Sequence, residues 1–193
     1  MGGVPGDRAA PRKWNAANAL TLLRLVLVPL LVWLLLRDGG EDTASRIAAA
    51  GVFAAAMVTD RVDGQLARRH GLVTDLGKIA DPIADKALTG AAFIGLSLLE
   101  ELPWWVTAVV LVREWGITAL RFAVIRYGVL PANRGGKLKT ALQALALVLY
   151  ILPLPDAWLP VQAAAMALAV GVTVVTGADY VAQALRLRKD AHA

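Results

Sequence analysis

Long apolar stretches separated by short polar segments form most of this chain. Six stretches of roughly 20 residues can be drawn, and a helix of that length crosses a bilayer core of about 30 Å. They cover residues 18–36, 45–61, 79–99, 104–127, 138–152 and 157–185, and the fifth is short and ends near Pro153. The pattern predicts an all-α, polytopic membrane protein with six transmembrane helices.

Composition agrees with a membrane protein rather than a water-soluble domain. Of 193 residues, 58% are hydrophobic, and the mean hydropathy is +0.58. The chain contains no cysteine, which excludes disulfides and thiolate metal sites. No small-residue cleavage site follows the first apolar stretch, so we expect that stretch to remain as a transmembrane helix.

The polar segments alternate in charge along the chain. Acidic residues gather in segment 38–42, at Glu100 and Glu101, and at Asp156, whereas the other segments are basic. Because basic residues stay on the cytoplasmic side, we expect both termini there, with tails 1–13 and 188–193 flanking one membrane domain, 14–187. The same rule explains the net charge of +5, so no nucleic-acid partner is expected.

Ionisable residues also occur inside or beside the apolar stretches, where they normally face a bundle interior or a water-filled cavity. Under the predicted topology they all fall in the cytoplasmic half: Arg24, Asp60, Asp63, Asp81, Asp85, Lys86, Arg113, Glu114, Arg121 and Asp179. The sequence therefore predicts a polar cavity that opens to the cytoplasm.

Four of these residues, Asp60, Asp63, Asp81 and Asp85, lie within 26 positions. The surrounding pattern is D-x-x-D-G-x-x-A-R, eight residues, and then G-x-x-x-D-x-x-x-D. No proline interrupts the second stretch, so its helix is expected to continue to about His70 and to return antiparallel after a short loop at 71–75. The fixed residues of each half then share one helix face, and the two acidic faces can meet.

Gathered carboxylates repel one another unless a cation compensates them. Oxygen ligands without histidine or cysteine favour Mg²⁺, Mn²⁺ or Ca²⁺ over Zn²⁺, and Mg²⁺ commonly shares carboxylates with substrate phosphates. With Arg68 nearby, the site suits a pyrophosphate. The alternative is structural: Asp81 or Asp85 would form intrahelical salt bridges with Lys78 or Lys86.

The full pattern resembles the signature of the CDP-alcohol phosphatidyltransferase family at every fixed position: Asp60, Asp63, Gly64, Ala67, Arg68, Gly77, Asp81 and Asp85. The six-stretch topology extends this resemblance to nearly the whole chain. Flanking motifs are similar to those of the bacterial phosphatidylglycerophosphate synthase branch: N-A-L-T-L-L-R at 18–24, D-P-I-A-D-K at 81–86, R-E at 113–114, A-L-R at 119–121 and G-K-L-K-T at 136–140.

The resemblance implies transfer of the phosphatidyl group of CDP-diacylglycerol to sn-glycerol 3-phosphate at the bacterial cytoplasmic membrane. It implies that Asp60, Asp63 and Asp81 hold two Mg²⁺ or Mn²⁺ ions, with Asp85 as the base and as a possible further ligand. The residues implied in binding CDP-diacylglycerol are Asn18, Thr21, Asp60, Gly64, Ala67, Arg68 and Gly77. The resemblance also suggests a homodimer.

The acceptor's phosphate needs further basic groups, for which the candidates are Arg113, Arg121, Lys137 and Lys139. Lys137 and Lys139 differ by about 200° on a helix, so both should not point into one cavity. Glu114 shares a helix face with Arg121 and is a candidate to orient it. Inositol phosphate, or phosphatidylglycerol as in a cardiolipin synthase, stays open as the acceptor, and a metal-ion transporter is the alternative from another class.

Overall fold

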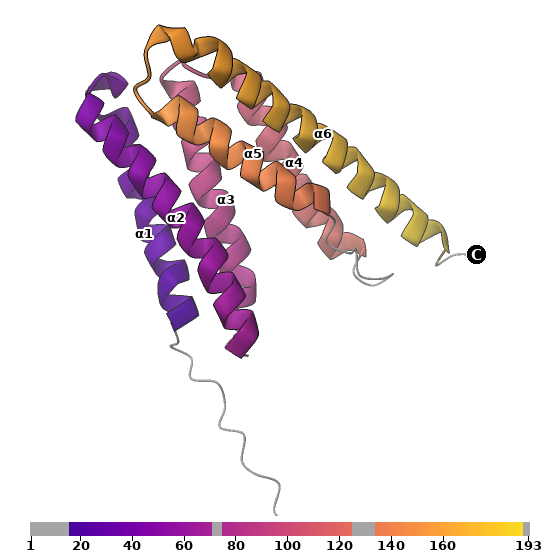
Figure 1. Ribbon diagram of the computed structural model, residues 1–193. Helices are drawn as coiled ribbons and strands as arrows, with labels where there is room; N and C mark the ends of the chain where they lie inside the picture. Colours follow the sequence, from indigo (N-terminus) through magenta and orange to yellow (C-terminus); the bar gives the residue numbers. More distant parts are fainter. Residues whose placement is uncertain (1–15, 71–74, 125–133, 191–193) are drawn as a thin grey trace, which may run out of the picture.

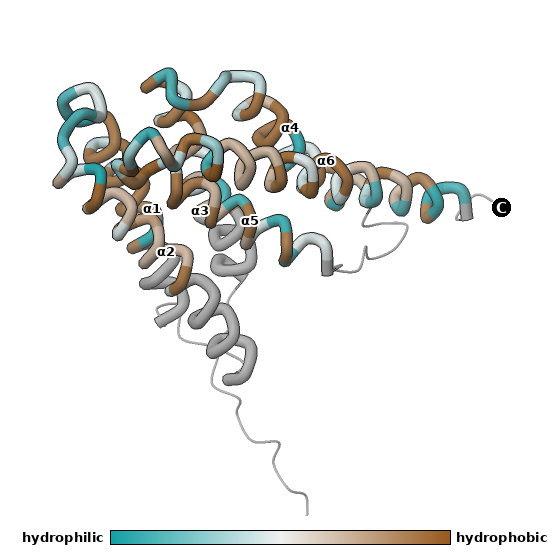
Figure 2. Tube along the Cα trace, turned by 45° about the horizontal axis from the view of Figure 1, so that its top comes forward, coloured by the Kyte–Doolittle hydropathy of each residue, from teal (hydrophilic) through white to brown (hydrophobic). Residues whose placement is uncertain are grey.

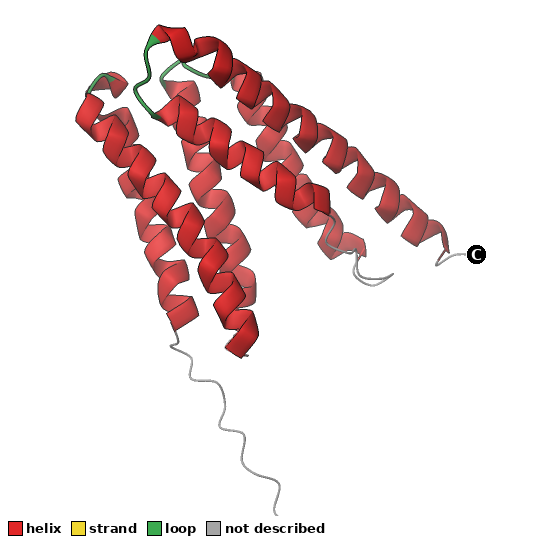
Figure 3. Ribbon diagram, viewed as in Figure 1, coloured by secondary structure: helices red, strands yellow, loops and turns green. Residues whose placement is uncertain are grey.

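A computed structural model of the chain describes residues 16–70, 75–124 and 134–190, and within them the side chains of 22–59, 83–84, 86–124 and 135–189. This part of the chain is helical and contains no strand (Figure 3), which confirms the all-α prediction. Its elements are α1 (Ala16–Leu36), η1 (Arg37–Gly40), α2 (Thr43–His70), α3 (Asp75–Leu98), α4 (Trp104–Val124), α5 (Arg134–Ile151), η2 (Asp156–Trp158) and α6 (Leu159–Asp190).

The six α-helices coincide with the six predicted stretches. Helix α2 runs without a break to His70, as the absence of proline predicted. The predicted N-terminal tail, the loop after His70 and the end of the fourth stretch fall outside the described residues. Within the described part, each apolar stretch therefore corresponds to one α-helix.

Helix α2 begins at a well-formed cap. The carboxylate of Asp42 accepts hydrogen bonds from the Ser45 hydroxyl at 2.5 Å and from the Ser45 and Ala44 amides at 3.2 and 3.3 Å. The Ser45 hydroxyl bond is the main cause that holds the pKa of Asp42 below its usual value. The capped end lies in the acidic segment that precedes the second apolar stretch.

The helices form two groups of three that meet at the upper end of Figure 1 and diverge toward the lower end. Helix α1 packs along both α2 and α3, and α6 packs along both α4 and α5. Contacts of α2 with α5, and of α3 with α4 and α5, join the groups. The C-terminal part of α2 and the start of α3 therefore lie at the diverging end, where the signature residues occur in sequence.

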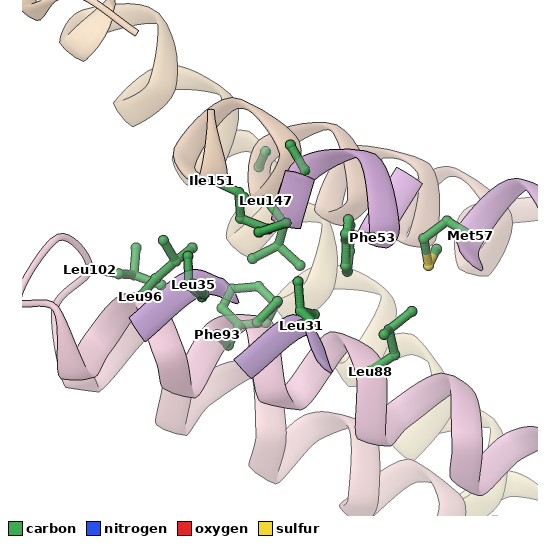
Figure 4. Close-up of a cluster of buried hydrophobic side chains, with 14 of the residues drawn as sticks. Leu31, Leu35, Phe53, Met57, Leu88, Phe93, Leu96, Leu102, Leu147 and Ile151 are labelled. Carbon is green, nitrogen blue, oxygen red and sulfur yellow. The ribbon is translucent and has the colours of Figure 1, made fainter. Parts of the chain in front are cut away.

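The apolar core sits where the two groups meet (Figure 4). Leu31 and Leu35 of α1, Phe53 of α2, Phe93 of α3 and Leu147 of α5 are all fully buried there. Burial of side chains of this size contributes about 1.5–3 kcal/mol each. The core thus fixes the convergent end of the bundle and sets the positions from which the polar helix segments extend.

Hydrophobic residues recur along all of the described helices (Figure 2), and many of the large ones are exposed. Large side chains such as Phe122, Val175 and Val112 are 70%, 69% and 72% exposed, a pattern that favours lipid over water as the surrounding medium. Among the described residues, one helical segment, Asp156–Lys189, is long and apolar enough to span a bilayer. Two shorter apolar segments are Thr43–Thr59 and Lys86–Leu98.

One buried arginine ties the convergent end together. Arg46 of α2 donates to both carboxylate oxygens of Glu101, in the turn after α3, and to the carbonyl oxygens of Tyr150 and Ile151 at 2.6 and 2.8 Å. Those carbonyls belong to the last turn of α5, which has no further helical amides to satisfy them. This Arg46–Glu101 clamp joins α2, α5 and the α3–α4 turn.

Candidate functional site

The predicted carboxylate site belongs to α2 and α3. Asp60 and Asp63 lie in the C-terminal half of α2, and Asp81 and Asp85 lie in the N-terminal half of α3. The side chains of these four residues are outside the described set, as are those of Asn18, Thr21, Ala67 and Arg68. The surroundings of Gly64 and Gly77 are outside it as well. Among the side chains that are described, no three acidic or histidine residues are placed to hold a metal ion.

The predicted acceptor residues belong to α4 and α5, and here the side chains are described. Glu114 of α4 accepts a hydrogen bond from Lys139 Nζ of α5 at 2.5 Å. The same oxygen, Oε1, lies 3.2 Å from Arg113 Nη1. All three side chains are largely buried, with exposed fractions of 7% for Lys139, 12% for Arg113 and 15% for Glu114. Two of the four predicted acceptor residues therefore share one carboxylate.

Tyr180 of α6 connects Arg113 to the third candidate. The guanidinium carbon of Arg121 lies 4.7 Å from the centre of the Tyr180 ring, and that of Arg113 lies 5.8 Å from it. Arg121 Nη2 also donates to the Tyr180 hydroxyl at 2.8 Å. We call Arg113, Glu114, Arg121, Lys139 and Tyr180 the basic cluster.

The structure separates the two candidate lysines of α5. Lys139 is buried against Glu114, whereas Lys137 is exposed. Helix α5 has already begun at Arg134, so the two side chains leave it in nearly opposite directions. The prediction that only one of them faces the interior is confirmed.

The predicted partnership of Glu114 with Arg121 is wrong. Glu114 contacts Arg113 and Lys139 instead, while Arg121 turns toward α6 and bonds to Tyr180. A shared face on one helix placed Glu114 and Arg121 on the same side, but residues of the adjacent helices lie closer to each of them.

A small pocket beside the basic cluster lies between α3, α4 and α5. Its lining includes Lys86, whose Nζ donates to the Thr118 hydroxyl and lies 5.5 Å from the Trp115 ring centre. Glu114 and Lys139 line the same pocket. Lys86 immediately follows Asp85 in α3, so the pocket connects the basic cluster with the helix that carries half of the carboxylate signature.

Sequence reasoning missed the contribution of α6. Arg113 Nη2 donates to the Thr176 hydroxyl at 3.1 Å, and the Arg113 stem crosses the helix at Gly177. Thr173, Thr176 and Tyr180 recur at helical spacing along an otherwise apolar stretch. That polar stripe was the signal that could have identified the face of α6 directed at α4.

The charges of the basic cluster do not balance. Among the described side chains, three cations face one carboxylate, which leaves an excess of two positive charges; Arg113 and Lys139 are largely buried, whereas Arg121 is exposed. An excess of this kind in a partly buried site is offset by an anion or by additional acids. The cluster is therefore suited to a small, doubly charged anion such as a phosphomonoester.

Comparison with known proteins gives a family match and several relatives. Residues 14–175 match the CDP-alcohol phosphatidyltransferase family. A Mycobacterium tuberculosis protein named as a probable phosphatidylglycerophosphate synthase is 55% identical over 172 residues, covering 89% of this chain and 82% of the relative. The Bacillus subtilis CDP-diacylglycerol–glycerol-3-phosphate 3-phosphatidyltransferase is 38% identical, covering 86% and 93%.

A third relative carries the name of a different activity. The Streptomyces coelicolor cardiolipin synthase (CMP-forming) is 35% identical over 177 residues, covering 88% of this chain and 82% of the relative. The family match covers most of the chain and includes the entire carboxylate signature. The chain belongs to the CDP-alcohol phosphatidyltransferase family.

Proposed function

We propose that this membrane enzyme transfers the phosphatidyl group of CDP-diacylglycerol to sn-glycerol 3-phosphate, giving phosphatidylglycerol phosphate and CMP. Family membership supports the donor, and the relatives at 55% and 38% identity carry names of this activity. The observation that carries the acceptor is the excess of two positive charges among the described side chains of the basic cluster. A phosphomonoester dianion matches that excess better than the phosphodiester of phosphatidylglycerol does.

The topology proposed for the enzyme has six transmembrane helices in one domain, 14–187, with both termini in the cytoplasm. Basic segments at alternate helix connections and the apolar exterior of the described helices support it. The basic cluster and the signature segments lie in the half of the bundle away from the Arg46–Glu101 clamp. A cavity in that half would open to the cytoplasm, from which the two water-soluble partners, sn-glycerol 3-phosphate and CMP, enter and leave.

In the proposed donor site, Asp60, Asp63 and Asp81 hold two Mg²⁺ or Mn²⁺ ions, with Asp85 as a possible further ligand. The donor set fits such ions because it offers carboxylates alone, in a chain without cysteine. When bound, the ions would offset negative charge on the pyrophosphate. The residues proposed to bind CDP-diacylglycerol are Asn18, Thr21, Asp60, Gly64, Ala67, Arg68 and Gly77.

Proton transfer is assigned to Asp85. Its carboxylate accepts the proton of the acceptor's primary hydroxyl as that oxygen bonds to the β-phosphorus of CDP-diacylglycerol. The bond from the β-phosphorus to the bridging pyrophosphate oxygen breaks, and CMP leaves with the electron pair. The acceptor's phosphate is held by Arg113, Arg121 and Lys139, with Lys137 at the outer edge of the site.

A CMP-release assay with purified enzyme and CDP-diacylglycerol tests the reaction. We expect turnover with sn-glycerol 3-phosphate, loss of turnover on chelation of divalent ions, and recovery with Mg²⁺ or Mn²⁺. Asp85→Asn should nearly abolish CMP release while the protein still folds, because an amide cannot take the proton. Substantial turnover by Asp85→Asn would remove Asp85 from the role of base.

The cardiolipin synthase relative makes phosphatidylglycerol the second candidate acceptor. The same assay should therefore compare sn-glycerol 3-phosphate, inositol phosphate and phosphatidylglycerol at matched concentrations. Preferred turnover of phosphatidylglycerol or inositol phosphate would reassign the acceptor and leave the donor chemistry unchanged. We also propose a homodimer, which crosslinking in the bilayer would test.

A further inference from the structure

Two residues of α6 contact the arginines of the basic cluster without belonging to the predicted acceptor set. Gly177 lies beneath the side chain of Arg113, and Tyr180 contacts both Arg113 and Arg121. They are three positions apart, so they occupy the same face of α6. That face is the one packed against α4, from which both arginines extend.

Gly177 lets the Arg113 side chain lie directly on the α6 backbone. A Cβ atom built at Gly177 would stand 3.1 Å from Arg113 Cγ and 3.5 Å from Arg113 Nε. In this position Nε is buried and has no hydrogen-bond partner among the described residues, whereas the two terminal nitrogens bond to Glu114 and Thr176. An unpaired buried donor costs free energy, so the close approach is not explained by stability alone.

Tyr180 supplies both a ring and a hydroxyl to the arginines. Its side chain is 2% exposed, and Arg121 both lies 4.7 Å from the ring centre and donates to the hydroxyl at 2.8 Å. Arg121 itself is exposed, so without Tyr180 its flexible side chain could adopt many rotamers in water. The ring restricts those rotamers and directs the guanidinium toward the α4–α6 contact.

We propose that Gly177 and Tyr180 are positioning residues that hold Arg113 and Arg121 ready for the acceptor phosphate. They do not touch the acceptor in this assignment; they act through the two guanidinium groups. Preorganised arginines lose less side-chain entropy on binding, and the benefit therefore falls on acceptor affinity rather than on the chemical step. The inference rests on the acceptor role proposed for the arginines.

Tyr180 is tested by steady-state kinetics of the full-length enzyme with each substrate varied in turn. Tyr180→Leu should raise KM for sn-glycerol 3-phosphate about tenfold, while KM for CDP-diacylglycerol and kcat stay near their original values. Tyr180→Phe keeps the ring and loses only the hydroxyl bond, so it should recover most of the affinity. Tyr150→Leu, which removes a tyrosine of α5 far from the cluster, serves as the control and should leave both KM values unchanged.

Gly177 is tested against a second glycine of the same helix. Gly177→Ala should raise KM for sn-glycerol 3-phosphate several-fold, because Arg113 must move by a few tenths of an ångström. Gly171→Ala is the matched control, since a Cβ atom there meets nothing within 4 Å. Equal kinetics for the two alanine variants would overturn the role of Gly177.

The two proposals fail in distinguishable ways. If Arg121→Ala leaves KM for sn-glycerol 3-phosphate unchanged, the acceptor placement itself is wrong. If Arg121→Ala raises that KM and Tyr180→Leu does not, the arginine binds the acceptor and Tyr180 does not position it. If Tyr180→Leu lowers the apparent kcat in proportion to a loss of folded enzyme and leaves both KM values unchanged, its role is structural, and the positioning assignment is rejected.

Discussion

Glu114 is the carboxylate of the basic cluster, and it contacts two of the three cationic side chains, Arg113 and Lys139. Its Oε1 atom accepts from Lys139 at 2.5 Å and lies 3.2 Å from Arg113. Removal of one partner from such a buried network leaves the remaining charges unpaired in a poorly solvated environment, which costs free energy. At the scale of single residues, buried and exposed members of the predicted acceptor set should therefore differ strongly in their effect on catalysis.

The two lysines of α5 provide that comparison. Lys139→Ala should raise KM for sn-glycerol 3-phosphate by roughly tenfold, because it removes a buried cation beside the phosphate site. Lys137→Ala should have a much smaller effect, since Lys137 is exposed and its charge is screened by water and salt. Kinetics of both variants at low and moderate ionic strength measure the difference. Equal increases in KM would contradict the inward placement of Lys139 alone.

The sequence predicted this lysine pair better than it predicted Glu114. The angular offset between positions 137 and 139 follows from helix geometry alone, and the structure confirms it. The contacts of Glu114 depend on how α5 and α6 pack against α4, and the spacing of residues within α4 carries no information about that packing.

At the scale of elements, helices α1 and α3 approach each other closely at a glycine of α3. A Cβ atom at Gly95 of α3 would lie 2.6 Å from Leu35 Cδ2 of α1, and Leu35 is fully buried. Small residues at helix contacts let backbones approach in this way, and they are common in membrane helices. The packing of α1 against α3 therefore depends on the missing side chain at Gly95.

Gly95→Ala should destabilise the protein by about 1–3 kcal/mol, the usual cost of overpacking a filled core. Gly51→Ala is the control, because a Cβ atom there meets nothing within 4 Å and alanine favours the helix. Thermal unfolding in detergent would measure both variants. If the clash is the cause, Leu35→Ala combined with Gly95→Ala should cost less than the sum of the two single changes. Strict additivity would reject this explanation.

The sequence predicted where each helix lies along the chain, but not which helices pack against one another. Apolar periodicity and the absence of proline located α2 through to His70, since these signals lie within one segment. The sequence also suggested that the acidic faces of α2 and α3 could meet, which concerns side chains outside the described set and stays a prediction. Helix α1 packs extensively against both α2 and α3, and Gly95 allows its close approach to α3.

At the scale of the whole molecule, the Arg46–Glu101 clamp joins segments from both groups of helices. Arg46→Ala would leave the Tyr150 and Ile151 carbonyls without their side-chain donor and Glu101 without its cation. We expect a loss of about 3 kcal/mol in stability, since the Arg46 side chain is 5% exposed. Arg46→Lys should recover only part of it, because an ammonium group cannot reproduce the two-pronged contact.

Arg37→Ala is the matched control for the clamp. Arg37 pairs with Asp38 at 3.5 Å, but these side chains are 49% and 68% exposed, so the pair should contribute well under 1 kcal/mol. Thermal unfolding of the three variants in one detergent measures the comparison. Similar losses for Arg46→Ala and Arg37→Ala would show that the clamp does not hold the bundle together.

The basic cluster takes its side chains from α4, α5 and α6, whereas the carboxylate signature lies on α2 and α3. In the proposed assignment, substitutions in one group of helices would change the alcohol that is used without disturbing the residues that activate the nucleotide. Headgroup choice and nucleotide activation can then diverge independently among relatives, such as the one named cardiolipin synthase at 35% identity.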